Sequence, residues 1–145
     1  MRAPMHPAFH PTLLQRIVMG STCLIALAIS YGGLFNPDGF LAGMELSATG
    51  PAGLNETRGQ YGGFFFLAAI YIGLGALGYV RPTSVLGFLL VLYGGVLFGR
   101  IWHLAAVGFG SFATYPFAMQ AIHFVDFCGL LLSAIALRQG SNTRA

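Results

Sequence analysis

Ionisable side chains lie in a very apolar part of the sequence, between Arg100 and Asp126. Arg100 and His103 precede an apolar, glycine-containing segment, and His123 and Asp126 follow it. If the two flanks are antiparallel helices joined near residues 112–113, residues at equal depth have numbers with the same sum. By this criterion Arg100 is level with Asp126, and His103 is level with His123. The spacing predicts the depth of these residues in the membrane. Whether their side chains face each other depends on the rotation of each helix about its axis.

These residue types are suited to ion pairing, to proton transfer and to metal binding. A histidine beside a carboxylate is a suitable acid or base. A metal site would need His103, His123 and one carboxylate, but short ligand spacings are missing, and we predict no metal. The sequence has no nucleophile motif and no phosphate-binding glycine loop. It therefore names neither a reaction nor a cofactor.

The composition is that of a protein dissolved in lipid. The chain has 145 residues, of which 56% are apolar and 8% charged, whereas a soluble domain carries about 25% charged residues. The net charge of +3 is scattered along the chain, and no basic run interleaves with aromatic residues. This pattern excludes nucleic acid as a partner.

Four apolar segments are long enough to cross a bilayer, whose hydrocarbon core requires about 20 helical residues. We expect these spans at residues 17–35, 61–80, 83–107 and 115–137. The predicted fold class is therefore all-α, a four-helix transmembrane bundle over residues 17–137. A polar N-terminal segment (1–16) and a polar C-terminal tail (138–145) flank it.

The segment between the first two spans is too short for another crossing. Its first residues, Asn36-Pro-Asp-Gly39, are a predicted turn, and residues 40–48 are predicted to form a short interfacial helix, with an ordinary loop as the alternative. Residues 49–53 should break this helix. Asn55 is the predicted N-cap of the second span, and Glu56 in its first turn suits the positive end of the helix dipole.

The placement of arginines predicts the orientation of the chain. With four spans, both termini and the turn at Arg81 share one side, which carries five of the seven arginines (Arg2, Arg16, Arg81, Arg138 and Arg144). Only Arg58 and Arg100 belong to the other side. The positive-inside rule then predicts a multi-pass protein of the inner membrane with both termini in the cytoplasm.

Small residues indicate how the spans pack. Gly59 with Gly63, and Gly95 with Gly99, are pairs four residues apart that allow transmembrane helices to approach closely. We expect these glycines to lie at helix–helix contacts.

The predicted topology places three groups of polar residues at one membrane face, toward the periplasmic leaflet. We expect them to converge inside the bundle as a charge-balanced ligand-binding or ion-pair site. The candidate residues are Asn55, Glu56, Arg58, Arg100, Trp102, His103, Gln120, His123 and Asp126. Structural roles are the alternatives: an ion-pair lock between helices for Arg100 and Asp126, packed histidines, a solvated helix entrance, and an aromatic belt residue at position 102.

A short motif supports the same architecture. The sequence Asn55-Glu-Thr-Arg-Gly-Gln-Tyr-Gly-Gly63, together with Gly99-Arg100, resembles an uncharacterised family of small bacterial four-helix membrane proteins, the domain-of-unknown-function family forty-three forty-five. The resemblance covers about residues 17–137. It implies a four-helix membrane protein and places Glu56, Arg58 and Arg100 in the characteristic polar set. It implies no activity.

Three classes of function remain open from the sequence. The first is a protein that binds membrane lipid, quinone or another small amphiphile at the polar site. The second is an accessory subunit of a larger membrane complex or homo-oligomer, in which the ion pairs lock the helices. The third is a small membrane enzyme that uses His123 or Glu56 as an acid or base.

Overall fold

The computed structural model describes residues 8–115 and 117–142, with the backbone alone at residues 107, 111, 118 and 140–142. This part of the chain is helical and has no strand. In chain order the helices are α1 (Leu13–Phe35), α2 (Pro37–Ala42), α3 (Gly50–Thr57), the π-helix η1 (Arg58–Phe64), α4 (Phe65–Ala76), α5 (Pro82–Val107), the 3₁₀-helix η2 (Phe109–Thr114) and α6 (Phe117–Asn142).

Four helical segments are long and apolar enough to cross a membrane. They are Leu13–Phe35, Gly50–Ala76, Pro82–Ala106 and Met119–Gln139. The predicted all-α fold with four spans is therefore confirmed, and the chain is a multi-pass membrane protein.

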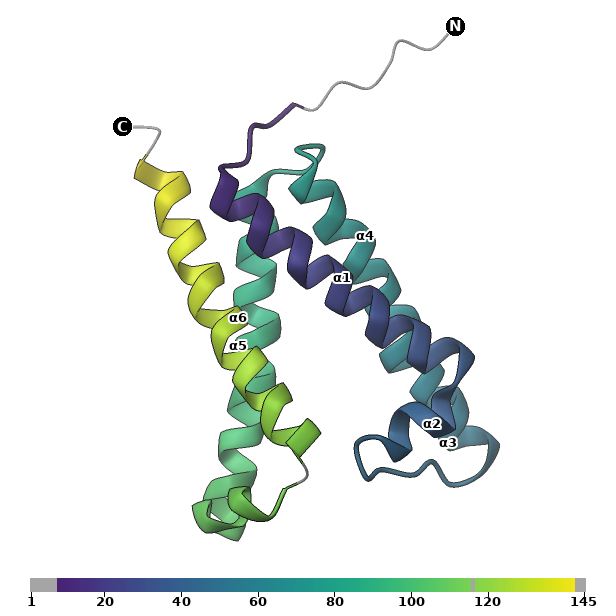
Figure 1. Ribbon diagram of the computed structural model, residues 1–145. Helices are drawn as coiled ribbons and strands as arrows, with labels where there is room; N and C mark the ends of the chain where they lie inside the picture. The colour runs from purple at the N-terminus through teal and green to yellow at the C-terminus, as the bar shows by residue number, and fades with distance from the viewer. Residues whose placement is uncertain (1–7, 116, 143–145) are drawn as a thin grey trace, which may run out of the picture.

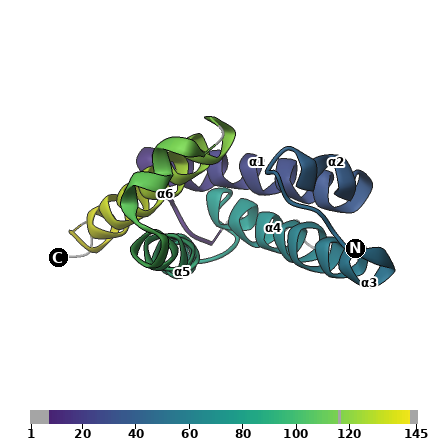
Figure 2. The same cartoon turned by 90° about the horizontal axis from the view of Figure 1, so that it is seen from below.

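The four spans form two pairs of helices. In one pair α1 packs against α4 and η1, and in the other α5 packs against α6. The two pairs lie close together where α1 begins and α6 ends, and they separate toward α2 and α3 (Figures 1 and 2). The helix pairs therefore make one shared core near the chain termini.

The shared core consists of small and aliphatic side chains with one tyrosine. Its members are Val18, Met19, Ala68, Ile72, Val85, Leu86, Leu89, Tyr93 and Ala136. A buried hydrogen bond ties α1 to α6 beside it, since Nε2 of Gln15 donates to the carbonyl of Ala136 at 3.1 Å. A hydrogen bond of this kind stabilises the contact because no water competes for these groups in lipid.

The first span begins earlier than its apolar residues suggested, at Leu13 instead of Ile17. Thr12 and Gln15 form a capping box: the side chain of each accepts a hydrogen bond from the backbone N–H of the other. This arrangement satisfies two amides that a helix start leaves without partners. The polar segment predicted at 1–16 thus ends in helix, and its residues 1–7 lie outside the described residues.

The connection between the first two spans differs from its predicted form. The predicted turn at residues 36–39 is wrong, because Pro37 begins helix α2 and Asn36 is its N-cap, accepting a hydrogen bond from Gly39 N at 3.3 Å. An asparagine followed by proline suits the start of a helix as well as a turn. The short helix accordingly covers Pro37–Ala42 and not residues 40–48.

The second span begins at Gly50 and not at Tyr61, so the predicted break at residues 49–53 and the predicted N-cap at Asn55 are both wrong. Pro51 lies in the first turn, where its missing N–H costs no helical hydrogen bond. Asn55 lies inside α3. The apolar pattern alone did not mark this start because residues 50–60 are largely small and polar.

The later helix ends lie close to their expected positions. The second span ends at Ala76, and the chain turns at Gly78, whose φ of 83° suits glycine. The carbonyl of Gly78 accepts a hydrogen bond from Phe9 N at 3.0 Å. Helix α6 continues past Leu137 to Asn142. Pro116, the predicted start of the fourth span, lies outside the described residues.

Candidate functional site

An ion pair joins α5 to α6 within the membrane-spanning region. Nε of Arg100 lies 3.0 Å from Oδ2 of Asp126, and the two side chains are 22% and 13% exposed. Asp126 is nine residues after the start of α6 at Phe117, which corresponds to about 14 Å along the axis. The predicted equality of depth is confirmed by this contact, and the rotation of both helices turns the two side chains toward each other.

His123 lies next to the ion pair, about one helical turn before Asp126 on α6. Its Nδ1 lies 2.6 Å from the carbonyl oxygen of Met119 and 3.2 Å from Nη1 of Arg100. A neutral imidazole nitrogen either donates or accepts, so Nδ1 serves one of these contacts at a time. The shorter contact favours donation to Met119, which leaves Nε2 as the nitrogen that can accept a hydrogen bond.

Aromatic rings enclose the imidazole on the side of the loop. The ring centroid of His123 lies 5.3 Å from that of Phe112 and 5.9 Å from that of Tyr115. Gln120 holds this loop, because its Nε2 donates to the carbonyls of Tyr115 at 3.0 Å and Phe112 at 3.4 Å. Gln120 therefore positions the aromatic rings next to His123, and its hydrogen bonds among the described residues go to the loop and not to the ion pair.

Two of the candidate residues on α5 point outward. Trp102 is 70% exposed and stacks on Phe98 at 6.5 Å between ring centroids. His103 is also exposed. Equal depth with His123 therefore does not bring the two histidines to one face.

The candidates on the second span lie apart from the ion pair. Asn55 and Glu56 on α3 and Arg58 on η1 are exposed. Glu56 accepts a hydrogen bond from Gln60 on the next turn. α3 lies beyond the far end of the α1–α4 pair, away from α5 and α6 (Figures 1 and 2). Of the predicted set, the structure brings together Arg100, His123 and Asp126.

The described residues around the ion pair include few side chains that could ligate a metal ion. Within residues 8–115 and 117–142 no three histidine, cysteine, aspartate or glutamate side chains gather in a way that could hold a metal ion. The cluster instead combines a guanidinium, a carboxylate and an imidazole. Such a set can form charge-assisted hydrogen bonds with a polar group of a ligand.

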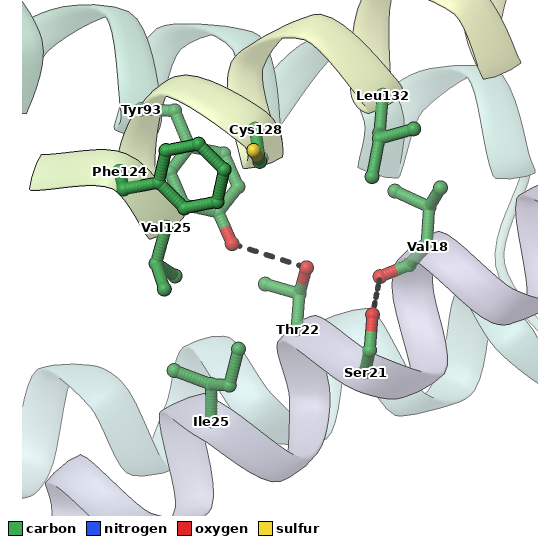
Figure 3. A pocket seen from close by; sticks show the side chains of 10 residues that line it. Val18, Ser21, Thr22, Ile25, Tyr93, Phe124, Val125, Cys128 and Leu132 are labelled. Carbon is green, nitrogen blue, oxygen red and sulfur yellow. Dashed lines mark hydrogen bonds between the residues drawn. The ribbon is translucent and has the colours of Figure 1, made fainter. Parts of the chain in front are cut away.

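Sequence reasoning missed a small pocket between α1, α5 and α6. Its volume is about 160 Å³. Thr22 of α1 and Tyr93 of α5 meet there, with their hydroxyl oxygens 3.1 Å apart (Figure 3). Both are polar residues near the middle of apolar spans, and this position is the only sequence signal that could have drawn attention to them.

A comparison of the chain with protein-family models, with curated proteins and with solved structures found no match. The resemblance carried by Asn55–Gly63 and by Gly99-Arg100 therefore stays a prediction. The geometry of the membrane-spanning helices therefore carries the inference of function.

Proposed function

We propose that Arg100, His123 and Asp126 bind the polar group of a lipid, a quinone or another small amphiphile between α5 and α6. We place this site toward the periplasmic leaflet of a bacterial inner membrane. One observation carries the proposal: an ion pair that lies within two spans is not fully closed off, since its side chains are 22% and 13% exposed. Charged groups in a bilayer are costly, and they commonly mark functional sites.

The hydrogen bonding of the pair also supports a polar ligand. Nε of Arg100 and Oδ2 of Asp126 are buried, yet among the described residues neither atom makes a well-aligned hydrogen bond. An arginine can donate five hydrogen bonds and a carboxylate can accept about four. These two buried atoms face each other, so the remaining nitrogens of Arg100, the Oδ1 atom of Asp126 and Nε2 of His123 are the atoms through which the cluster would bind a headgroup.

Native mass spectrometry of the protein purified in mild detergent tests this proposal. We expect the wild type to retain a small amphiphile and Arg100→Ala or Asp126→Ala to lose it. A double variant, Arg100→Met with Asp126→Leu, separates binding from stability, because an apolar pair of similar size can replace a buried ion pair without loss of stability. It should fold as well as the wild type and carry no ligand.

The matched control is Arg58→Ala, which removes an exposed arginine on η1. It should retain the ligand. If the Arg100→Met, Asp126→Leu double variant keeps the same bound molecule as the wild type, the charges only lock the two helices and the proposal is wrong.

A second candidate is an accessory subunit of a larger membrane complex. Gly95 and Gly99 support it, because a Cβ atom added at either residue would meet no atom within 4 Å. Within the described part of the chain, no helix packs closely against this pair of glycines as predicted. The surface of α5 at these two residues is therefore open to close packing by a helix of another protein. Affinity purification in mild detergent tests this candidate: a partner should co-purify with the wild type and be lost on Gly95→Leu.

A further inference from the structure

The pocket between α1, α5 and α6 contains a pair of hydroxyls near the middle of the membrane-spanning region. Apolar side chains line most of it, among them Val18, Ile25, Phe124 and Leu132. Thr22 and Tyr93 approach each other across it (Figure 3). These two residues are 6% and 7% exposed. Both residues are therefore buried, and the space next to their hydroxyls is the pocket itself.

The hydroxyl pair has one hydrogen more than it can use. Each hydroxyl carries a single hydrogen, and the bond between Thr22 and Tyr93 takes up one of the two. The usual local acceptor for a threonine in a helix is a carbonyl about one turn earlier. For Thr22 that carbonyl belongs to Val18, and it receives the hydroxyl of Ser21 at 3.1 Å instead.

The spare hydrogen therefore lacks an acceptor among the described residues. Thr22 is nine residues after Leu13, the first residue of α1, which places it about 14 Å along the helix. Water is scarce at this depth of a bilayer, so an unsatisfied polar group there is energetically costly. An acceptor on a molecule from the membrane would remove this cost.

We propose that this pocket binds a carbonyl group of a membrane-dissolved molecule, whose oxygen accepts the spare hydrogen of the Thr22–Tyr93 pair. The pocket is lined by an aromatic ring and aliphatic chains, which suit the hydrocarbon next to such a carbonyl. Its volume of about 160 Å³ is close to that of an apolar cavity of about 150 Å³ that accepts benzene. One ring or a short length of chain therefore fits.

This site is separate from the ion-pair site proposed above, because the two share no side chain, although Asp126 lies close enough to Tyr93 for its charge to act on the hydroxyl. Two sources can supply the carbonyl, a ring ketone such as a quinone or the ester of an acyl lipid. The chemistry at the hydroxyl pair is the same for both. The experiment must therefore distinguish binding of the carbonyl group from binding of the hydrocarbon alone. It must also distinguish a ring ketone from an acyl ester.

Equilibrium binding to the full-length protein in lipid nanodiscs makes this separation. The probes are a decyl-substituted benzoquinone, decyl acetate, and decylbenzene as the probe without a carbonyl. We expect the wild type to bind at least one carbonyl probe about three- to tenfold more tightly than decylbenzene, the range of a single hydrogen bond. The carbonyl probe that binds more tightly indicates whether the natural carbonyl belongs to a ring ketone or to an acyl ester.

The double variant Thr22→Val with Tyr93→Phe removes both hydroxyls and keeps the shape of the pocket. It should bind the three probes equally, and its unfolding temperature should change little, because both partners of the hydrogen bond are replaced together. Each single variant retains one hydroxyl with a free hydrogen, so it should keep the preference for a carbonyl. All of these variants are compared in the Arg100→Met, Asp126→Leu background, which removes the polar groups of the ion-pair site, so a carbonyl preference measured there comes from the hydroxyl pair.

The matched control is Ser21→Ala. Ser21 also lines the pocket, but its hydroxyl is already donated to Val18, and the preference should be unchanged. The proposal is overturned if the wild type shows no preference for a carbonyl probe. It is also overturned if the double variant keeps the preference, or if a single variant loses it at unchanged stability.

Discussion

Charged side chains within a membrane span are individually costly, at roughly 2.5–3.5 kcal/mol on insertion scales. Arg100 and Asp126 reduce this cost for each other by their contact at 3.0 Å. Some other polar side chains in the spans have acceptors on neighbouring helices: Gln15 donates to the Ala136 carbonyl, and Ser30 donates to the Gly62 carbonyl. At the scale of single residues, polar groups thus serve as contacts between helices, and the ion pair is the contact that also retains some exposure.

Gly129 of α6 is required by the ring of Tyr93. A Cβ atom at Gly129 would lie 2.4 Å from Cζ of that ring, and the ring is fixed by its hydrogen bond to Thr22. We expect Gly129→Ala to lower the free energy of unfolding by about 1–3 kcal/mol, as overpacking does in other cores. Unfolding in mixed micelles with increasing denaturing detergent would measure the change.

Gly95→Ala is the matched control for this measurement, because a Cβ atom at Gly95 meets no atom within 4 Å. It should leave the free energy of unfolding unchanged or raise it by less than about 1 kcal/mol, since alanine favours a helix more than glycine. Equal effects of the two substitutions would contradict the packing described for Tyr93.

The sequence predicted that Arg100 and Asp126 lie at equal depth, and the reason lies in the geometry of antiparallel helices. Equal depth follows from counting residues away from the loop, and it placed Arg100 beside Asp126 correctly. The same counting placed His103 beside His123, yet His103 is exposed. Rotation of a helix about its axis depends on its apolar face, and the apolar residues of α5 are spread around the helix with no preferred side. Counting alone therefore could not decide which histidine faces inward.

At the scale of elements, the π-helix η1 determines how α1 crosses the second span. Ser30 of α1 donates its hydroxyl to the carbonyl of Gly62 at 2.9 Å, and a Cβ atom at Gly33 would lie 2.6 Å from the backbone nitrogen of Gly62. π-Helical segments inside α-helices are rare. Here the widened turn brings backbone against backbone, and the small residues on both helices allow it.

Gly33→Ala should separate α1 from η1, because a Cβ atom there meets backbone atoms that cannot rotate away. We expect a loss of stability of about 2 kcal/mol or more, within the range for overpacked cores. Gly59→Ala is the control, since Gly59 lies in the same π-helix with no atom within 4 Å of an added Cβ. The same detergent unfolding series measures both variants, and an unperturbed Gly33→Ala protein would show that the crossing is looser than described.

The spans were predicted well, whereas the element between the first two was not, because different signals control them. Hydrophobic length alone identifies a span. The start of α3 at Gly50 and the cap of α2 at Asn36 depend on which of two local structures a polar, proline-containing segment adopts. Asn36-Pro37 and Gly50-Pro51 suit both a turn and a helix start. Packing against α1 favours the helix at α2, whereas α3 contacts η1, and η1 packs against α1.

At the scale of the whole molecule, the two helix pairs meet at one end of the bundle and separate at the other (Figure 1). The closed end contains the shared core and the contact of Gln15 with Ala136. The ion pair of Arg100 and Asp126 lies within the α5–α6 pair. This pair contacts α1 mainly through α6. A ligand at the ion pair would consequently leave the shared core undisturbed.

The ion pair also bears on the orientation of the chain in the membrane. Arg100 lies inside a span and is neutralised by Asp126, so it does not act as a free charge in a loop. Of the arginines that the structure describes, Arg58 is then the one left at the end where α2 and α3 lie. Arg16, Arg81 and Arg138 lie at the opposite end or near it. Because orientation follows arginine and lysine in short flanking segments, we predict that the termini face the cytoplasm.

Cysteine labelling of intact cells tests this prediction. Cys23 and Cys128 are free and would first be replaced by alanine. Single cysteines would then be introduced at Ser47, Ala113 and Gln139, which are all exposed. A membrane-impermeant maleimide should react with the cysteines at 47 and 113 in intact cells. It should react with the cysteine at 139 only after the membrane is opened, and the reverse pattern would show that the bundle is inserted the other way round.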